Sequence, residues 1–323
     1  MPVDPVRIDH LAQESRYLPA ILEKVARLED LLAESARHPY LGERVALKGG
    51  TAINFVLLPE APRLSVDIDL NYVGEVGREE MKKDRPVVEE SLKRIFDAAS
   101  YEIAVRASYG ATAWTLRYTN LAGNRDSIKV EVNWLLRVPI WTPQRLPFQS
   151  LFAEEPVHVV CLAPEEIVAG KFAALLDRGA PRDLFDVATL ADLGAAGDPD
   201  RLRRATVLLG SFQPPDLRQR LKSPLSPDIS LREVRQTLWP TLRRGDQPTV
   251  DQLNASAEPL LREVLTLDER ENAYLEAFYE QRRFDPMSLF EGTDARPDLP
   301  SHPMAQWRLQ ALELGSNRDP EPT

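Results

Sequence analysis

Two short runs of the sequence alternate strictly between apolar and polar residues. In SVDIDLN, residues 65–71, every even position is aliphatic and every odd position is polar. In IKVEVNW, residues 128–134, the even positions are again apolar, and the odd positions hold Lys129, Glu131 and Asn133. Because successive side chains of a β-strand point to opposite faces, each run predicts a strand with one apolar and one polar face.

Three carboxylates lie on these two polar faces. If the strands are neighbours, Asp67, Asp69 and Glu131 meet, and each raises the pKa of the others unless a cation neutralises them. One cysteine and four scattered histidines offer no zinc-ligand spacing, so carboxylates and a hard ion such as Mg²⁺ are the expected pair. Two such ions about 3.5–4 Å apart would suit an in-line displacement at phosphorus. The alternative is a half-exposed sheet whose polar face meets water.

A Gly-Gly-Thr turn precedes the first of these strands by one predicted helix. The start of a helix presents free backbone N–H groups and the positive end of the helix dipole, which suit the oxygens of a triphosphate. Small residues also open many helices without any ligand. Thr51 is expected to be the N-cap of a helix that runs to about residue 58, and a contact of its hydroxyl with phosphate is the alternative. The candidate nucleotide-binding residues here are Lys48, Gly49, Gly50, Thr51 and Ser65.

A second cluster of charge lies in KFAALLDRGAPRDLFD, residues 171–186. Lys171 and Arg178 are seven residues apart and share a face of one helix, and Asp183 and Asp186 are three apart on the next. One interpretation is a network of ion pairs that joins the two helices. The other, which we favour for Lys171 because its neighbours are small or apolar, is neutralisation of phosphate charge during transfer. Arg178 and Arg182 are further candidates for nucleotide binding.

The pattern along the chain predicts an α/β (α+β) protein. Helices are expected at about 11–37 with an interruption near Pro19, at 51–58 and at 78–99, and strands at 44–48, 64–73, 102–109, 112–119, 127–135 and 157–161. A proline-bearing loop is expected at about 138–150. From Pro164 the pattern is helical, with Pro164 as a first helical residue and Gly179 at the end of that helix. We therefore predict a mixed sheet in the N-terminal half and a helical domain after it.

The length of 323 residues suggests about two domains. We expect a catalytic domain at 1–160 with an N-terminal helix, a helical domain at 161–310 that completes the active site and docks RNA, and a disordered tail at 311–323. The formal charge of −10 disfavours a surface that coats nucleic acid everywhere. Residues 201–250 nevertheless hold ten Arg or Lys against four Asp or Glu, which indicates either a polyanion surface or solvated helices.

The single cysteine fits the reducing cytoplasm. The N-terminus lacks the pattern of a signal peptide, and no apolar run is long enough to span a membrane. We therefore expect a cytoplasmic protein without a membrane partner.

Four motifs in order, GGT, SVDIDL, KVEVNW and K-x₆-R-x₃-R-D-x₂-D, resemble the AbiEii/AbiGii-type nucleotidyltransferase toxins of the polymerase-beta-like superfamily. The resemblance covers residues from about 40 to 310. It implies the nucleotidyltransferase fold, an NTP substrate, Mg²⁺, a cognate antitoxin and, from characterised members, tRNA as a target. Two features depart from the smaller relatives: the third acid is Glu131 where many have Asp, and 15 residues separate Thr51 from Asp67.

The resemblance also implies roles for individual residues. Gly49, Gly50 and Thr51 would hold the triphosphate, Asp67 and Asp69 would bind metal, and Glu131 would be a third metal ligand or the base. Lys171 would contact the nucleotide, and Asp183 and Asp186 would complete the catalytic set. We predict transfer of a nucleotidyl group to the 3′ end of tRNA, with nucleotidylation of a protein or small molecule, or a non-catalytic nucleotide-binding or antitoxin-like module, as alternatives.

Ser65 lies two residues before Asp67 on the same predicted face. Phosphorylation there would add roughly −1.5 to −2 charge beside three acids. We hypothesise that this modification would silence the enzyme, and the alternative is a small residue that simply fits.

Overall fold

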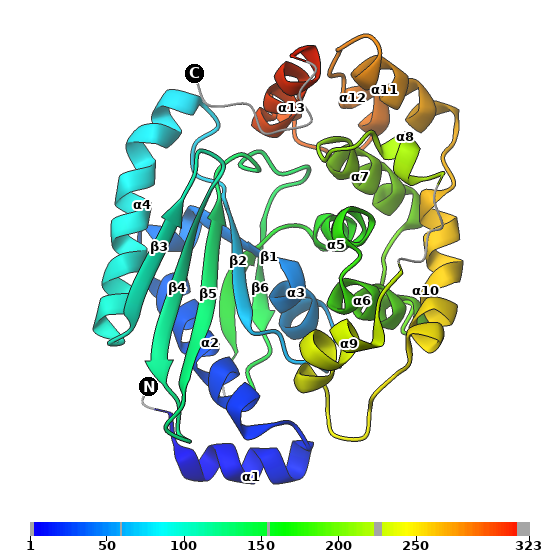
Figure 1. Cartoon of the computed structure of the whole chain (residues 1–323). Coiled ribbons are helices and arrows are strands. Elements are labelled where there is room, and N and C mark those ends of the chain that lie inside the picture. Colours follow the sequence, from blue (N-terminus) through cyan, green and yellow to red (C-terminus); the bar gives the residue numbers. More distant parts are fainter. Residues whose placement is uncertain (1–2, 59, 154–155, 223–227, 315–323) are drawn as a thin grey trace. The chain divides into compact units, whose positions relative to one another are not determined.

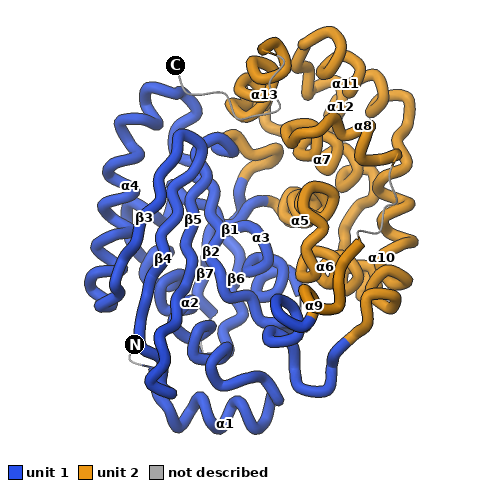
Figure 2. The backbone as a smooth tube through the Cα atoms, in the orientation of Figure 1, with its two compact units in different colours: residues 1–137, 143–162, 235–247 blue, residues 138–142, 163–234, 248–323 orange. Residues whose placement is uncertain are grey.

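The chain forms two compact units (Figure 1, Figure 2). The computed structural model describes residues 3–58, 60–153, 156–222 and 228–314. Unit 1 comprises 1–137, 143–162 and 235–247, and unit 2 comprises 138–142, 163–234 and 248–323. The main boundary at 162 lies close to the division expected at 160. The two short exchanged segments, 138–142 and 235–247, were not anticipated from the sequence.

Unit 1 is built on one seven-stranded sheet with the order β3-β4-β5-β2-β1-β7-β6. Its strands are β1 (Val45–Lys48), β2 (Asp67–Tyr72), β3 (Glu102–Ala107), β4 (Ala111–Thr119), β5 (Arg125–Asn133), β6 (Gln144–Phe148) and β7 (Val157–Cys161). β2 runs antiparallel to β1 and parallel to β5, and β1 runs parallel to β7. The predicted mixed sheet and α/β class are therefore confirmed.

Helices cover the apolar face of this sheet. The main ones are α2 (Pro19–Arg37) and α4 (Arg78–Ala98), while α1 (Pro5–Ser15) packs against α2. α2 buries a stripe of Leu and Val side chains, and α4 buries Phe96, whose ring packs edge-on against Trp114 of β4 with centroids 5.9 Å apart. Full burial of such side chains stabilises the fold by about 1.5–3 kcal/mol each. The opposite, polar face of β2 and β5 does not contribute to this core.

The structure corrects several expected elements. The chain at 144–148 is the strand β6 rather than a loop, and Pro147 is tolerated because β6 is an edge strand that does not need every N–H. The first helix begins at Pro5, earlier than expected. A hairpin turn joins β4 to β5, with Gly123 at φ +80° and its N–H bonded to Asn120 O.

The helix after β1 also differs from expectation. It begins at Gly49 as α3 (Gly49–Ala52) and continues as the π-helical segment η2 (Ile53–Leu57). Lys48 occupies the N-cap position and Thr51 lies inside the helix. The prediction of Thr51 as N-cap is therefore wrong, because its hydroxyl bonds to another strand instead of to the helix.

In its described part, unit 2 contains helices and no strand. Its helices are α5 (Pro164–Arg178), α6 (Pro181–Asp192), α7 (Pro199–Ser211), α8 (Leu217–Arg220), α9 (Leu231–Glu233), α10 (Val250–Leu265), α11 (Glu269–Tyr279), α12 (Met287–Phe290) and α13 (Pro303–Glu313), with a 3₁₀ turn at Leu299–Ser301. The 3₁₀ turns at Leu41–Glu43 and Trp239–Thr241 belong to unit 1.

Both predicted ends of α5 are confirmed. The helix starts at Pro164, and Gly179 follows its last residue in the left-handed conformation, with φ +58°. α13 extends to Glu313, so the first three residues of the predicted tail are helical; residues 315–323 lie outside the described part. None of the described helices combines the length and apolar character that crossing a bilayer requires.

Candidate functional site

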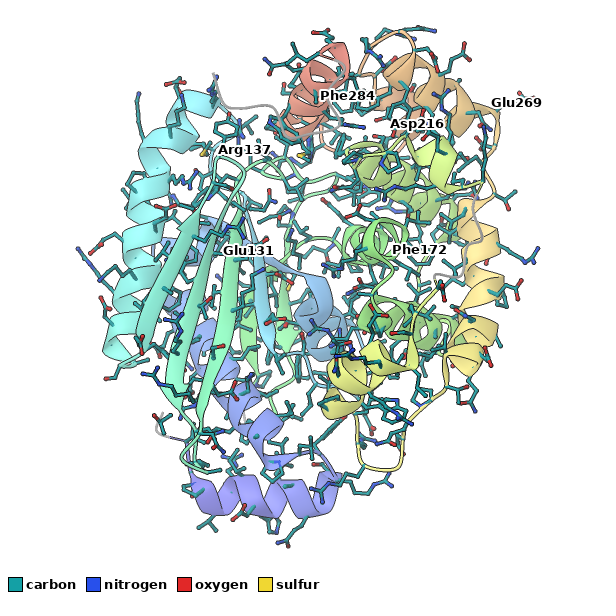
Figure 3. All side chains as sticks on the ribbon, viewed as in Figure 1. Glu131, Arg137, Phe172, Asp216, Glu269 and Phe284 are labelled. Atoms are coloured by element: carbon teal, nitrogen blue, oxygen red, sulfur yellow. The ribbon has the colours of Figure 1, made fainter. Side chains whose placement is uncertain are left out.

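The two alternating runs pair as neighbouring strands. In the parallel register of β2 and β5, Asp67 lies opposite Lys129 and Asp69 lies opposite Glu131. Directly opposed residues point to the same face of a sheet, so Asp67, Asp69 and Glu131 share one face, as the alternation of the two runs predicts. Figure 3 labels Glu131 on β5. On the other side of β2, Lys48 of β1 lies opposite Asp69.

The Asp69 carboxylate is surrounded by the other charged side chains of this face. Burial raises its pKa above the ordinary value, and the charges of Asp67 and Glu131 raise it further, while Lys48 and Lys129 lower it. The net shift is upward, so the surroundings of this carboxylate do not fully compensate its negative charge. A cation beside Asp69 would relieve that imbalance.

Glu131 has a cationic partner already. Lys129 Nζ donates a 2.7 Å hydrogen bond to Glu131 Oε2 from two residues away on the same strand. Within the described residues, no group of three or more His, Cys, Asp or Glu side chains is arranged to hold a metal ion. By its donor chemistry, the pair Asp67 and Asp69 fits a divalent ion, whereas the described residues do not form the predicted three-carboxylate metal site.

The turn formed by Gly49 and Gly50, called the glycine corner below, lies against β2, the strand that carries Asp67 and Asp69. Gly49 has φ +72°, and a Cβ added to it would lie 2.7 Å from Asp69 Oδ2. A side chain is therefore excluded there both by the backbone conformation and by the carboxylate. The Gly-Gly-Thr turn therefore lies beside Asp69.

Thr51 and Ser65 connect the helix to the segment before β2. Thr51 Oγ1 donates to Asp67 O at 2.5 Å and lies 2.9 Å from Ser65 Oγ. Both side chains are buried. These bonds fix the backbone of Asp67 relative to Gly49 and Gly50, which gives Thr51 a positioning role.

Unit 2 carries the second predicted cluster as a network of ion pairs around the buried side chains of Lys171, Asp183 and Asp186. Lys171 Nζ lies 2.7 Å from Asp183 Oδ1 and 3.0 Å from Asp186 Oδ2, and Arg178 Nε lies 2.7 Å from Asp183 Oδ2. Burial raises the pKa of Asp183, but Lys171 and Arg178 outweigh it and lower the pKa to about 2. The network joins α5 to α6, as one of the two sequence interpretations expects. Arg182 is partly exposed on α6.

The basic run 201–250 is divided between the units, and part of its charge is paired with acids. Among the described residues, five of its ten cations form ion pairs: Arg201 with Glu165 and Asp294, Arg203 with Glu271, Arg218 with Asp216 and Glu280, Arg220 with Asp177, and Arg243 with Glu60. Residues 235–247 belong to unit 1 and the rest to unit 2. These pairs favour the interpretation of solvated, ion-paired helices over a single continuous polyanion surface.

Sequence reasoning missed one residue at this site. Arg63 is only 2% exposed, and its guanidinium lies against Gly50. The available signal was its position two residues before Ser65 and four before Asp67, in the polar register of the run.

Comparisons with known proteins identify the family and the fold. The family described as "Nucleotidyl transferase AbiEii toxin, Type IV TA system" matches residues 30–282. Among solved structures, the chain is similar to MenT4, a nucleotidyltransferase toxin from Mycobacterium tuberculosis H37Rv, with a TM-score of 0.66 and 18% identity over 89% of this chain and 98% of that one.

A second solved structure is an antigenic nucleotidyltransferase-like protein from Paracoccidioides brasiliensis, with a TM-score of 0.33 and 19% identity over 64% of this chain and 94% of that one. A comparison with curated proteins gives no match.

Proposed function

Because the chain belongs to the AbiEii family of nucleotidyltransferase toxins of type IV toxin–antitoxin systems, we propose that it transfers a nucleotidyl group from an NTP to RNA. The acceptor we favour is the 3′ end of tRNA. The observation that carries this proposal is the contact of Gly49 with Asp69 on a strand whose neighbour presents Glu131.

Unit 1 offers two kinds of group for the triphosphate of an NTP: backbone N–H groups for its oxygens and carboxylates for its metal ion. The backbone N–H groups at Gly49 and Gly50 open a helical segment and are suited to phosphate oxygens. Asp67 and Asp69 would hold Mg²⁺, which, when bound, stabilises the negative charge that develops during phosphoryl transfer. We propose that two such ions bind. Glu131 would be a further ligand or the base for the attacking hydroxyl.

Lys171 belongs to the proposal through the family motif. Its ammonium is held between Asp183 and Asp186, so those carboxylates would position it for a nucleotide contact. Arg178 and Arg182 are proposed as neighbouring contributors. The expected partners are an NTP, an RNA acceptor and a cognate antitoxin, and the proposed location is the cytoplasm, where the buried free thiol of Cys161 would remain reduced.

The test is a transfer assay with purified protein, Mg²⁺ and each labelled NTP in turn. Label should appear in total tRNA with the wild type and should fall by about a thousandfold or more in Asp67→Asn, about 4 kcal/mol of transition-state free energy. Lys171→Ala should also abolish transfer and growth inhibition. If label appears in a protein extract instead of in tRNA, the acceptor is a protein and the RNA proposal is wrong. If toxicity survives Asp67→Asn, the protein acts by binding and not by catalysis.

A further inference from the structure

Arg63 occupies the space in which Gly50 would carry a side chain. A Cβ added to Gly50 would lie 2.4 Å from Arg63 Nη2 and 3.5 Å from Arg63 Cζ. The guanidinium therefore packs directly on the Cα of Gly50, in the middle of the Gly-Gly-Thr turn. Gly50 needs no left-handed conformation, since its φ is not among the positive values, so this packing is the structural reason for a glycine here.

The same guanidinium lies near polar groups that are hydrogen-bonded, through Thr51, to the backbone of Asp67. Ser65 Oγ lies 3.3 Å from the added Cβ position, and Thr51 Oγ1 joins Ser65 to Asp67 O. Arg63 Nη1 also donates a long bond of 3.4 Å to Leu64 O. The side chains of Arg63 and Ser65 thus pack together against the Cα of Gly50.

An arginine in this position has an electrostatic consequence. Its guanidinium stays charged at any pH that the protein meets, even when the side chain is 2% exposed. A buried cation acts through a low dielectric, so its attraction for a nearby anion is screened less than that of a surface lysine.

We propose that Arg63 is a positioning residue for the triphosphate: it fixes the Gly49–Gly50 corner by packing on Gly50, and its charge favours a polyphosphate over a monophosphate at that corner. This inference rests on the proposed function, because it concerns the same nucleotide. Arg63 acts through the corner and is not itself assigned to the reacting atoms.

The first experiment measures binding without catalysis. Isothermal titration with a non-hydrolysable NTP analogue and with the matching nucleoside monophosphate should show an affinity loss of about tenfold or more for the triphosphate in Arg63→Ala and a much smaller loss for the monophosphate. Arg63→Lys should recover part of the triphosphate affinity. A protein that is merely less folded would lose both ligands equally, and equal losses would overturn the proposal.

Arg137 offers a matched control in the same unit (Figure 3). It is 5% exposed and donates to Val76 O and Trp134 O, so Arg137→Ala also removes a buried arginine. It should lower thermal stability but leave the ratio of triphosphate to monophosphate affinity unchanged. A similar change in that ratio for both variants would count against a specific role for Arg63.

The second experiment is a double-mutant cycle. Gly50→Ala alone forces the guanidinium to move and should raise the KM for the NTP with a smaller change in kcat. Once Arg63→Ala has emptied the space, Gly50→Ala should cost little more, so the double variant should match Arg63→Ala. Effects that multiply independently would overturn the inference. If Arg63→Ala does not fold, the same cycle with Arg63→Lys decides the question, because a lysine removes the planar group that meets the added Cβ.

The two proposals fail in different ways. If the wild type neither binds nor transfers any NTP, the proposed function is wrong. If the wild type binds and transfers normally while Arg63→Ala keeps its triphosphate affinity, only the inference about Arg63 is wrong.

Discussion

Gly49 shows how one position combines a local and a distant requirement. Its φ of +72° is a conformation that glycine adopts at little cost, and the missing side chain leaves room for the Asp69 carboxylate. The residue types GGT marked this corner from the sequence, but the contact with Asp69 depends on the pairing of β1 with β2. Thr51 illustrates the converse: its capping tendency was overridden by a bond to Asp67 O.

Ser65 provides a prediction at this scale. It is 5% exposed and lies 2.9 Å from Thr51 Oγ1. Ser65→Glu places a carboxylate close to Asp67 and should lower kcat/KM for transfer by about a hundredfold or more, about 2.7 kcal/mol. Ser65→Ala, which loses only a hydroxyl contact, should retain most of the activity. Full activity in Ser65→Glu, at an unchanged thermal midpoint, would contradict the silencing effect proposed for phosphorylation.

Among the elements, α5 and α6 depend on each other through buried charge. Asp183 is 1% exposed and is held by Lys171 and Arg178. Asp183→Ala leaves the buried ammonium of Lys171 with less compensation, so the free energy of unfolding should fall by about 3–5 kcal/mol. The measurement is chemical denaturation at pH 7.

The matched control for that experiment is Arg178→Ala. The Arg178 side chain is 62% exposed, so water screens its pair with Asp183 and its loss should cost about 1 kcal/mol or less. Equal losses in the two variants would show that burial of the network does not determine its strength.

Glu29 on α2 makes unit 1 sensitive to pH. Burial raises the pKa of this carboxyl from 4.5 to about 7, although Ser150 and the Leu151 N–H donate to it. Between these two pH values the unfolded chain loses the proton and the folded chain keeps it, so stability falls as pH rises.

The expected loss from Glu29 is about 2–3 kcal/mol in the free energy of unfolding between pH 4.5 and pH 8. Glu29→Gln should remove this part of the pH dependence and be the more stable protein at pH 8. Denaturant titrations of both proteins across that range test it, and identical slopes against pH would assign the dependence to other groups.

At the scale of the whole molecule, unit 1 is completed by a segment far along the chain. Residues 235–247 make two backbone hydrogen bonds to the rest of unit 1. Leu64 N donates to Thr241 O at 2.8 Å, and Arg244 N donates to Arg16 O at 2.9 Å. The Arg243 guanidinium also lies over the Tyr17 ring. Figure 2 shows this segment in the colour of unit 1. The first of these bonds lies directly beside Arg63.

A fragment of residues 1–162 should therefore be less stable than unit 1 in the intact chain, by about 2–4 kcal/mol for two backbone hydrogen bonds and the lost packing. A fusion that adds residues 230–247 through a flexible linker should recover much of the difference. Thermal unfolding followed by circular dichroism provides the measurement, and equal midpoints for the fragment and the fusion would show that the segment is dispensable.

The sequence by itself determined the class of fold and the chemistry of the strand faces. Alternation in residues 65–71 and 128–134 specifies which side chains share a face, because the period of a strand is two, and proline and glycine mark both ends of α5 for local backbone reasons. Only the tertiary structure decided that β2 and β5 are neighbours, that Arg63 fills the place of a side chain on Gly50, and that residues 235–247 belong to unit 1. Those facts rest on contacts between residues far apart in the chain, and local patterns carry no information about which distant partner will meet them.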